Sequence, residues 1–125
     1  MANQPMSVQQ HNHRKLLAWQ QSIALVEHIY HVTKPFPKDE TFGLTAQLRR
    51  SAVSVPSNIA EGAGRNSTKE LVQFLGIASG SLAEVDTQLE IAMRLGYLDG
   101  SSDVFGQVSR VGQLLVALRR SLKSQ

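Results

Sequence analysis

Apolar residues recur along this chain every three or four positions, which is the period of a helix that buries one face. Four segments show this pattern, and no segment alternates apolar and polar residues as a half-buried strand does. Short stretches rich in proline, glycine and serine separate the four segments. We therefore expect an all-α protein in which residues 14–125 form an antiparallel, up-down-up-down, left-handed four-helix bundle.

The first expected helix spans residues 14–33 and ends before two prolines, because a residue that precedes proline disfavours the α conformation. The second is expected to begin at Pro37 or Lys38 and to end at residues 62–64. Pro56 lies inside its apolar period, which predicts a kinked but continuous helix. The apolar stripes are Leu16, Trp19, Ile23, Val26 and Tyr30 in the first helix, and Leu44, Leu48, Val55 and Ile59 in the second.

The third expected helix has the clearest boundaries. Ser67 and Glu70 have the spacing of a capping box at its start, and Gly96 is typical of a helix end. The fourth begins after Gly100, with Ser101 or Ser102 as its cap. The seam of the third helix is Leu71, Leu75, Ala78, Leu82, Val85, Leu89 and Ala92, and that of the fourth is Val104, Val108, Val111, Leu115, Leu118 and Leu122.

The composition fits a single small domain. The chain has 125 residues and no cysteine, which excludes disulfides and thiolate metal sites. No apolar run reaches the length of about 20 residues that crosses a membrane, so we expect a cytoplasmic protein. Residues 1–13 are polar and rich in glutamine, which predicts a disordered tail.

Several segments together carry a resemblance to a known family. They read AWQ at 18–20, FP at 36–37, FGLT at 42–45, QLRRSAVSVPSNIAEG at 47–62, GSLAEV at 80–85, QLE at 88–90 and LGYL at 95–98. Over residues 16–123 the chain resembles the four-helix-bundle proteins encoded in intervening sequences of bacterial 23S ribosomal RNA genes. The resemblance implies an up-down-up-down bundle that assembles into a ring of five subunits. A related branch is the accessory protein of diversity-generating retroelements, which binds a reverse transcriptase and nucleic acid.

Enzyme chemistry is not indicated. No glutamate has a histidine three residues later, as di-iron bundles require. His28 and His31 are interpreted as surface histidines. There is no nucleophile elbow and no phosphate-binding glycine loop. The resemblance supplies no catalytic residues either, so we expect a protein without enzymatic activity, metal or cofactor.

A polar stripe along the second helix is the most unusual feature of the sequence. It mixes charged side chains with small hydroxyl groups beside the helix-internal proline. Three interpretations stay open: a contact with another subunit, a hydrogen-bond network inside the bundle, and a ligand site. Gly76 and Gly80 in the third helix are likewise expected to let another backbone come close. The residues of the polar stripe are Gln47, Arg50, Ser54, Ser57, Asn58 and Glu61.

Charge is distributed unevenly along the expected bundle. One end would collect the starts of the first and third helices and the ends of the second and fourth. Seven cations are expected there against two carboxylates, whereas the opposite end mixes both signs. In a cyclic ring such ends face the same way and suit a phosphate backbone. The seven cations are Arg14, Lys15, Arg65, Lys69, Arg119, Arg120 and Lys123.

Two functions follow from these observations. The first is a non-enzymatic oligomeric adaptor that binds structured RNA or DNA backbone through this cationic end. The second is a protein-interaction scaffold for a partner such as a reverse transcriptase. Cations near helix C-termini also complement the helix dipole, which accounts for Arg119, Arg120 and Lys123 but not for Arg14, Lys15 or Lys69. The expected partners are therefore further copies of the chain, with nucleic acid or a second protein.

Overall fold

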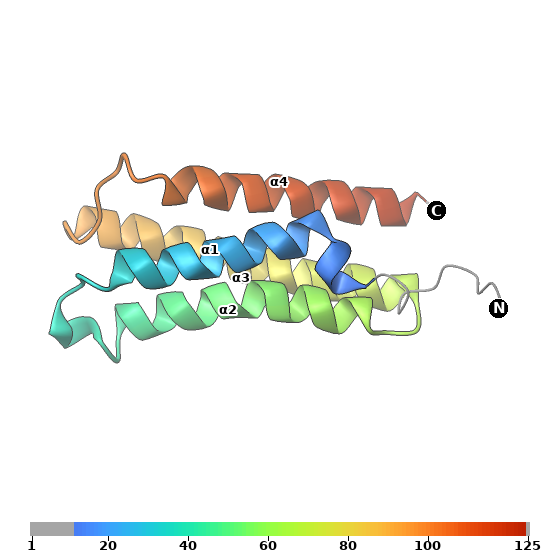
Figure 1. Ribbon diagram of the computed structural model, residues 1–125, viewed down its shortest axis with the longest axis horizontal. Helices are drawn as coiled ribbons and strands as arrows, with labels where there is room; N and C mark the ends of the chain where they lie inside the picture. Colours follow the sequence, from blue (N-terminus) through green and yellow to red (C-terminus); the bar gives the residue numbers. More distant parts are fainter. Residues whose placement is uncertain (1–11, 125) are drawn as a thin grey trace.

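The computed structural model describes residues 12–124, which form four long helices and no strand (Figure 1). The helices are α1 (Leu17–Thr33), α2 (Leu44–Ala63), α3 (Thr68–Arg94) and α4 (Val104–Lys123). Two short 3-10 turns, η2 (His13–Lys15) and η3 (Lys38–Glu40), precede α1 and α2. The all-α prediction is confirmed. The prediction of a disordered tail falls almost entirely on residues 1–11, which lie outside the described part of the chain.

The helix ends gather at the two poles of an elongated molecule. Figure 1 shows the α1–α2 and α3–α4 connections at one pole, and the α2–α3 connection, the start of α1 and the end of α4 at the other. This placement is what an up-down-up-down bundle requires. Each helix packs on two neighbours, in the order α1, α2, α3, α4 and back to α1. The handedness of the bundle stays a prediction.

The third helix agrees with the sequence in its seam and at both ends. All seven residues of the predicted seam are buried. At the start, Ser67 Oγ accepts a hydrogen bond from the Glu70 N–H at 3.1 Å and donates one to Glu70 Oε1 at 3.3 Å. At the other end, Gly96 has φ of 82°. The Tyr97 and Gly96 N–H groups donate to the Ala92 and Met93 carbonyls, which completes a Schellman cap.

The second helix begins later than the sequence predicts. Pro37 is followed by the η3 turn, and α2 starts only at Leu44, so the predicted start at Pro37 or Lys38 is wrong. Gly43 has a non-helical backbone conformation and caps the start of α2. The carboxylate of Glu40 accepts a hydrogen bond from the Leu44 N–H at 3.0 Å. The helix then continues through Pro56 to Ala63, which confirms that it is continuous.

The start and the buried face of the first helix also differ from the prediction. Residues 13–15 form the η2 turn, so α1 begins at Leu17. The core receives Ala18, Ser22, Leu25, Ile29 and Thr33, one position away from the predicted stripe. Ser22 and Thr33 can be buried because their hydroxyls donate to the Trp19 and Ile29 carbonyls at 2.8 and 2.7 Å.

The predicted stripe therefore faces the outside of the α1–α2 pair. Ile23 and Tyr30 are exposed, while Leu16, Trp19 and Val26 are partly buried at the edge of the core. Phe42, in the connection to α2, is 95% exposed, and Val53 on α2 is exposed as well. The outer surface of α1 and α2 is therefore partly apolar, whereas the outer face of a helix in a bundle is usually polar.

A glycine fixes the close packing of α2 on α3, but it is not one of the two that the sequence suggests. A Cβ added to Gly62 would lie 2.7 Å from Phe74 Cβ and 3.1 Å from Leu71 Cδ1. At Gly80 such an atom would meet nothing within 4 Å, and at Gly76 it would meet only the side chain of Arg119. Close backbone approach at Gly76 and Gly80 is therefore not a feature of this subunit.

None of the helices between residues 12 and 124 is both long and apolar enough to span a bilayer.

Candidate nucleic-acid interface

The seven predicted cations belong to elements that meet at one pole. Arg14 and Lys15 lie in η2, Lys69 lies in the first turn of α3, and Arg65 lies in the connection between α2 and α3. Arg119, Arg120 and Lys123 lie in the last turns of α4. Figure 1 places all of these segments at the same end of the molecule, which we call the basic end. The carboxylates on these segments are Glu61 and Glu70.

Five of the seven cations are exposed and not paired with a carboxylate. They are Arg14, Lys15, Lys69, Arg120 and Lys123. Among the described residues, ion pairs form only between Glu61 and Arg65 and between Glu90 and Arg94, so none of these five is neutralised by a carboxylate. Exposed, unpaired cations are the groups that replace counterions along a phosphate backbone.

Two arginines of the basic end are held against aromatic rings. The Arg14 guanidinium lies 5.4 Å from the Trp19 ring centroid, and that of Arg65 lies 4.8 Å from the Phe74 centroid. Arg65 also pairs with Glu61 at 2.8 Å. These cation–π contacts orient the two side chains and lower the entropy lost on binding a ligand.

Sequence reasoning missed the aromatic part of this end. The apolar period of the first helix places Trp19 in its buried stripe, and Phe74 lies outside the predicted seam of the third helix. Only the spacing of Arg14 and Trp19, close in sequence, offered a signal. Arg65 and Phe74 meet because the short α2–α3 connection folds the arginine back over α3. One face of each ring carries a guanidinium, so these rings serve to position cations.

Arg119 differs from the other members of the basic end. Its guanidinium lies across α3, with Nη2 3.4 Å from the position that a Cβ on Gly76 would occupy. Its Nε is buried and has no hydrogen-bond partner among residues 12–124. The side chain therefore packs between α4 and α3, and it is less exposed at the basic end than Arg120.

The polar stripe of α2 falls into three different environments. Ser54 and Asn58 belong to an internal network, in which Ser54 Oγ lies 2.9 Å from Ser81 Oγ of α3, and Asn58 Nδ2 donates to Ser54 Oγ at 2.9 Å. Gln47 and Arg50 are exposed and line a polar groove of about 380 Å³ between α2 and α3. Ser57 and Glu61 face outward, with Ser57 donating to the Val53 carbonyl and Glu61 pairing with Arg65.

The opposite end mixes charges and ties its two connections together. Lys34 and Lys38 lie there with Asp39, Glu40 and Asp99. The Tyr97 hydroxyl donates to Glu40 Oε2 at 3.1 Å, which joins the α3–α4 connection to the α1–α2 connection and raises the pKa of Tyr97.

The same end holds an acid whose ionised form is stabilised. The Ser101 N–H and hydroxyl both donate to Asp99 Oδ1 at 2.9 Å. These bonds, the backbone one first, lower the pKa of Asp99.

The predicted surface histidines do not gather with carboxylates. His28 Nδ1 lies 2.6 Å from Gln107 Oε1 and so links α1 to α4, while His31 is exposed. Within residues 12–124, no three histidine, aspartate or glutamate side chains come together in a way that could hold a metal ion.

Fold and surface together define an all-α, four-helix protein with one cationic pole. The chain belongs to the family of 23S rRNA-intervening sequence proteins, whose family model matches residues 14–117. No curated protein shows a detectable match to this sequence.

A solved structure has the same fold. It is described as a protein with unknown function from the S23 ribosomal protein family of Bacteroides thetaiotaomicron VPI-5482. The match has a TM-score of 0.76 and 20% sequence identity, and it covers 83% of this chain and 96% of that one. At this identity the likeness concerns the fold alone.

Proposed function

We propose that this protein is a non-enzymatic, oligomeric adaptor in the cytoplasm that binds the backbone of structured RNA or DNA through its basic end. The observation that carries the proposal is the convergence of cations from four separate chain segments on one pole, where five of them are exposed and form no ion pair with the described residues. Membership of a family named for 23S rRNA intervening sequences supports a nucleic-acid ligand but does not choose between RNA and DNA.

Assembly would multiply this charge. In a closed cyclic oligomer every subunit points its basic end to the same side, so a modest charge per subunit sums to a strongly positive face. Five subunits are the number that the family resemblance implies. Contacts to phosphate carry no sequence information, so binding should depend strongly on salt and little on sequence.

The test compares two double variants in a salt titration. Fluorescence anisotropy is measured with a labelled RNA hairpin and a labelled DNA duplex for the native chain, for Arg120→Gln with Lys123→Gln, and for Lys34→Gln with Lys38→Gln. All four substituted residues are exposed, and the second pair lies at the opposite end. The Arg120 and Lys123 variant should bind more weakly and show a smaller dependence of log K on log salt, by about two phosphate contacts per subunit.

Two results would contradict the proposal. If only the Lys34 and Lys38 variant loses affinity, the nucleic acid binds the end opposite the basic end, and the proposal is wrong. If the native chain shows no salt-sensitive binding to either nucleic acid, the function is the alternative one, a scaffold for a protein partner such as a reverse transcriptase. The exposed apolar surface of α1 and α2 favours that alternative, since such surfaces commonly bind protein.

A further inference from the structure

The outer surface of α1 and α2 forms one continuous apolar patch with a cationic border. Trp19, Ile23 and Val26 line a hollow of about 310 Å³ together with Val53, and Val53 also lines a second hollow of about 510 Å³ with Tyr30 and Phe42. Arg49 and Arg50 border the second hollow. We call this surface the α1–α2 face. Exposed apolar side chains that gather in one place commonly mark a contact with another protein chain.

Arg49 is fixed at this face without a carboxylate partner. Its Nε donates to Thr33 Oγ1 at 2.9 Å, and its guanidinium lies 4.5 Å from the Tyr30 ring centroid. Neither of the two ion pairs in the described residues involves it. The α1–α2 face thus presents an ordered positive charge beside exposed aromatic rings, which suits a partner surface that is apolar and acidic.

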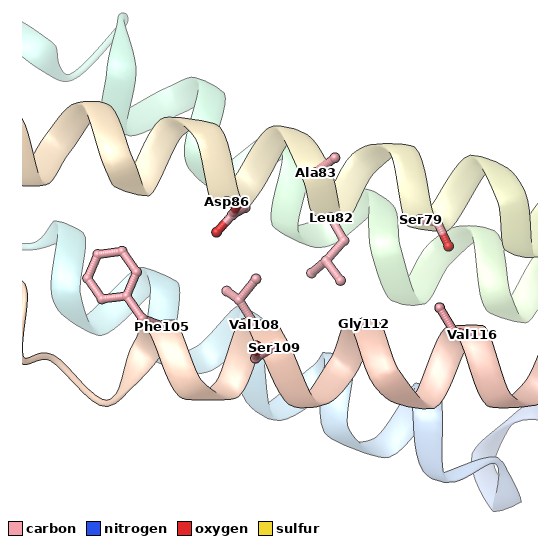
Figure 2. A pocket seen from close by; sticks show the side chains of 9 residues that line it. All are labelled: Ser79, Leu82, Ala83, Asp86, Phe105, Val108, Ser109, Gly112 and Val116. Carbon is pink, nitrogen blue, oxygen red and sulfur yellow. The ribbon is translucent and has the colours of Figure 1, made fainter.

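A surface with those properties lies on the other side of the same subunit. α3 and α4 leave a groove of about 360 Å³ between them, lined by Leu82, Phe105, Val108, Gly112 and Val116. Figure 2 shows Leu82 and Asp86 reaching from α3 toward α4, and Phe105 and Val108 rising from α4 toward them. We call this the α3–α4 groove. Asp86 is exposed at its edge and forms no ion pair with the described residues.

The two surfaces match in level along the bundle as well as in character. At a rise of about 1.5 Å per residue, Arg49 lies roughly 8 Å from the start of α2, and Asp86 roughly 12 Å from the end of α3. Both helix ends lie at the pole opposite the basic end (Figure 1). Phe42 just precedes α2, and Phe105 is the second residue of α4, so they also lie near that pole. If two subunits lie side by side and point in the same direction, Arg49 of one therefore lies at nearly the same height along the bundle axis as Asp86 of the other, and Phe42 lies near the height of Phe105.

We infer that the α1–α2 face of one subunit docks in the α3–α4 groove of a second copy, with Arg49 facing Asp86 and Phe42 near Phe105. The contact joins two different surfaces, so it is head-to-tail and each subunit keeps one free surface of each kind until a ring closes. Because all subunits point the same way, every basic end faces one side. The inference rests on the proposed oligomer and is independent of whether the ligand is nucleic acid.

The test uses one charge inserted in each surface. Val53→Glu alters the α1–α2 face and Val116→Glu alters the groove; these valines are 41% and 52% exposed, so neither change should disturb the core. Masses are measured by light scattering and sedimentation at micromolar concentration. The native chain should form a discrete oligomer, whereas each variant alone should be a monomer. Mixed in equal amounts, the two variants should form a 1:1 complex and nothing larger, because each supplies one intact surface.

Control variants distinguish the loss of a specific subunit interface from a general effect of added charge on assembly. Ile91→Glu alters an exposed apolar residue of α3 that lines neither surface, and it should keep the native mass. The chain with both Val53→Glu and Val116→Glu should stay monomeric in any mixture. If either single variant proves unfolded by circular dichroism, Phe42→Asp and Ser109→Arg replace the pair, since both residues are exposed and line the same two surfaces.

The outcomes distinguish this inference from the proposed function. A native oligomer whose mass neither variant changes overturns the inference and leaves the adaptor function standing. Two monomeric variants that fail to associate when mixed also overturn it, because a lesion in a self-complementary contact behaves that way. A native chain that is monomeric at every concentration overturns the oligomer and this inference together, while the nucleic-acid titration still reports on the basic end of the single subunit.

Discussion

Ser54 Oγ of α2 and Ser81 Oγ of α3 lie 2.9 Å apart, across the most extensively packed pair of helices in the bundle. Ser81 is buried, and Ser54 also accepts a hydrogen bond from Asn58. Small hydroxyl side chains here satisfy one another and leave room for the backbones to approach. The loss of a hydroxyl group and the addition of side-chain volume at this position should therefore both lower the free energy of unfolding.

Removal of either hydroxyl should cost about 1 kcal/mol, and the two losses should not add, because each breaks the same bond. The measurement is urea unfolding of Ser54→Ala, Ser81→Ala and the double variant at one protein concentration. Ser81→Val should cost more than Ser81→Ala, by about 1–3 kcal/mol of overpacking. Fully additive single losses would show that the bond contributes nothing.

Two glycines should respond to alanine with opposite signs. Gly62→Ala should destabilise the bundle by about 1–3 kcal/mol, since its Cβ would lie 2.7 Å from Phe74 Cβ. Gly80→Ala places a methyl group in open space within a helix, so it should stabilise by about 0.5–1 kcal/mol. Thermal or urea unfolding of the two variants checks both signs. A Gly62→Ala chain as stable as the native one would mean that α2 and α3 can move apart at no cost.

Position along the seam of α3 should matter for leucine truncation. Leu89 is fully buried, whereas Leu82 is 7% exposed and borders the α3–α4 groove. In the monomeric chain that carries Val53→Glu and Val116→Glu, no second copy covers the groove. There Leu89→Ala should cost about 4–5 kcal/mol and Leu82→Ala about 2–3, because water can fill the space next to the groove. The comparison requires unfolding of both variants in that background under identical conditions. A larger loss for Leu82→Ala would show that the groove of the single subunit is closed to water.

The Tyr97–Glu40 hydrogen bond should appear in an alkaline titration. The bond holds the proton on the phenol, and the neighbouring negative charges act in the same direction, so the pKa of Tyr97 is raised. Its contribution to stability is fully present below the pKa of an unfolded tyrosine, about 10, and is lost as the pH rises through the higher folded value. Ultraviolet absorbance of tyrosinate in a Tyr30→Phe background reports Tyr97 alone, because the chain has 2 tyrosines.

Glu40→Gln is the matched variant for that titration. Glutamine keeps an oxygen that can accept the Leu44 N–H, but it removes the negative charge. The pKa of Tyr97 should then fall toward its ordinary value. A titration curve that does not change between the two chains would show that Tyr97 and Glu40 do not interact in solution.

The sequence predicted α3 well because its signals agree with one another. Its cap residues, its heptad seam and its terminal glycine all mark the same element, so local and tertiary preferences coincide. For α1 they conflict. Its most apolar stripe lies toward the outside, while the buried side includes Ser22 and Thr33. The hydroxyls of Ser22 and Thr33 donate to carbonyls of their own helix, so both side chains can be buried. A hydrophobicity pattern counts these two residues as polar and therefore assigns them to the surface.

The candidate site was predictable as a set of charges and not as a set of contacts. The alternation of helix directions is enough to bring the cations of four segments to one end. The inward packing of Arg119 depends on the absence of a side chain at Gly76, in another helix. The stacking of Arg65 on Phe74 depends on how a connection folds back. Both are properties of packing between elements, for which a single sequence gives no periodic signal.

The start of α1 and the end of α4 lie at the basic end, which matters for how this protein can be handled at the bench. An affinity tag or fluorophore attached directly to the start of η2 or to the end of α4 would sit beside the cations under study, and a polyhistidine tag would add charge to them. Because the sequence has no cysteine, a single introduced thiol would be a unique attachment point. A single thiol introduced by Asp39→Cys, on the exposed η3 turn at the other pole, could be labelled uniquely and would leave the basic end untouched.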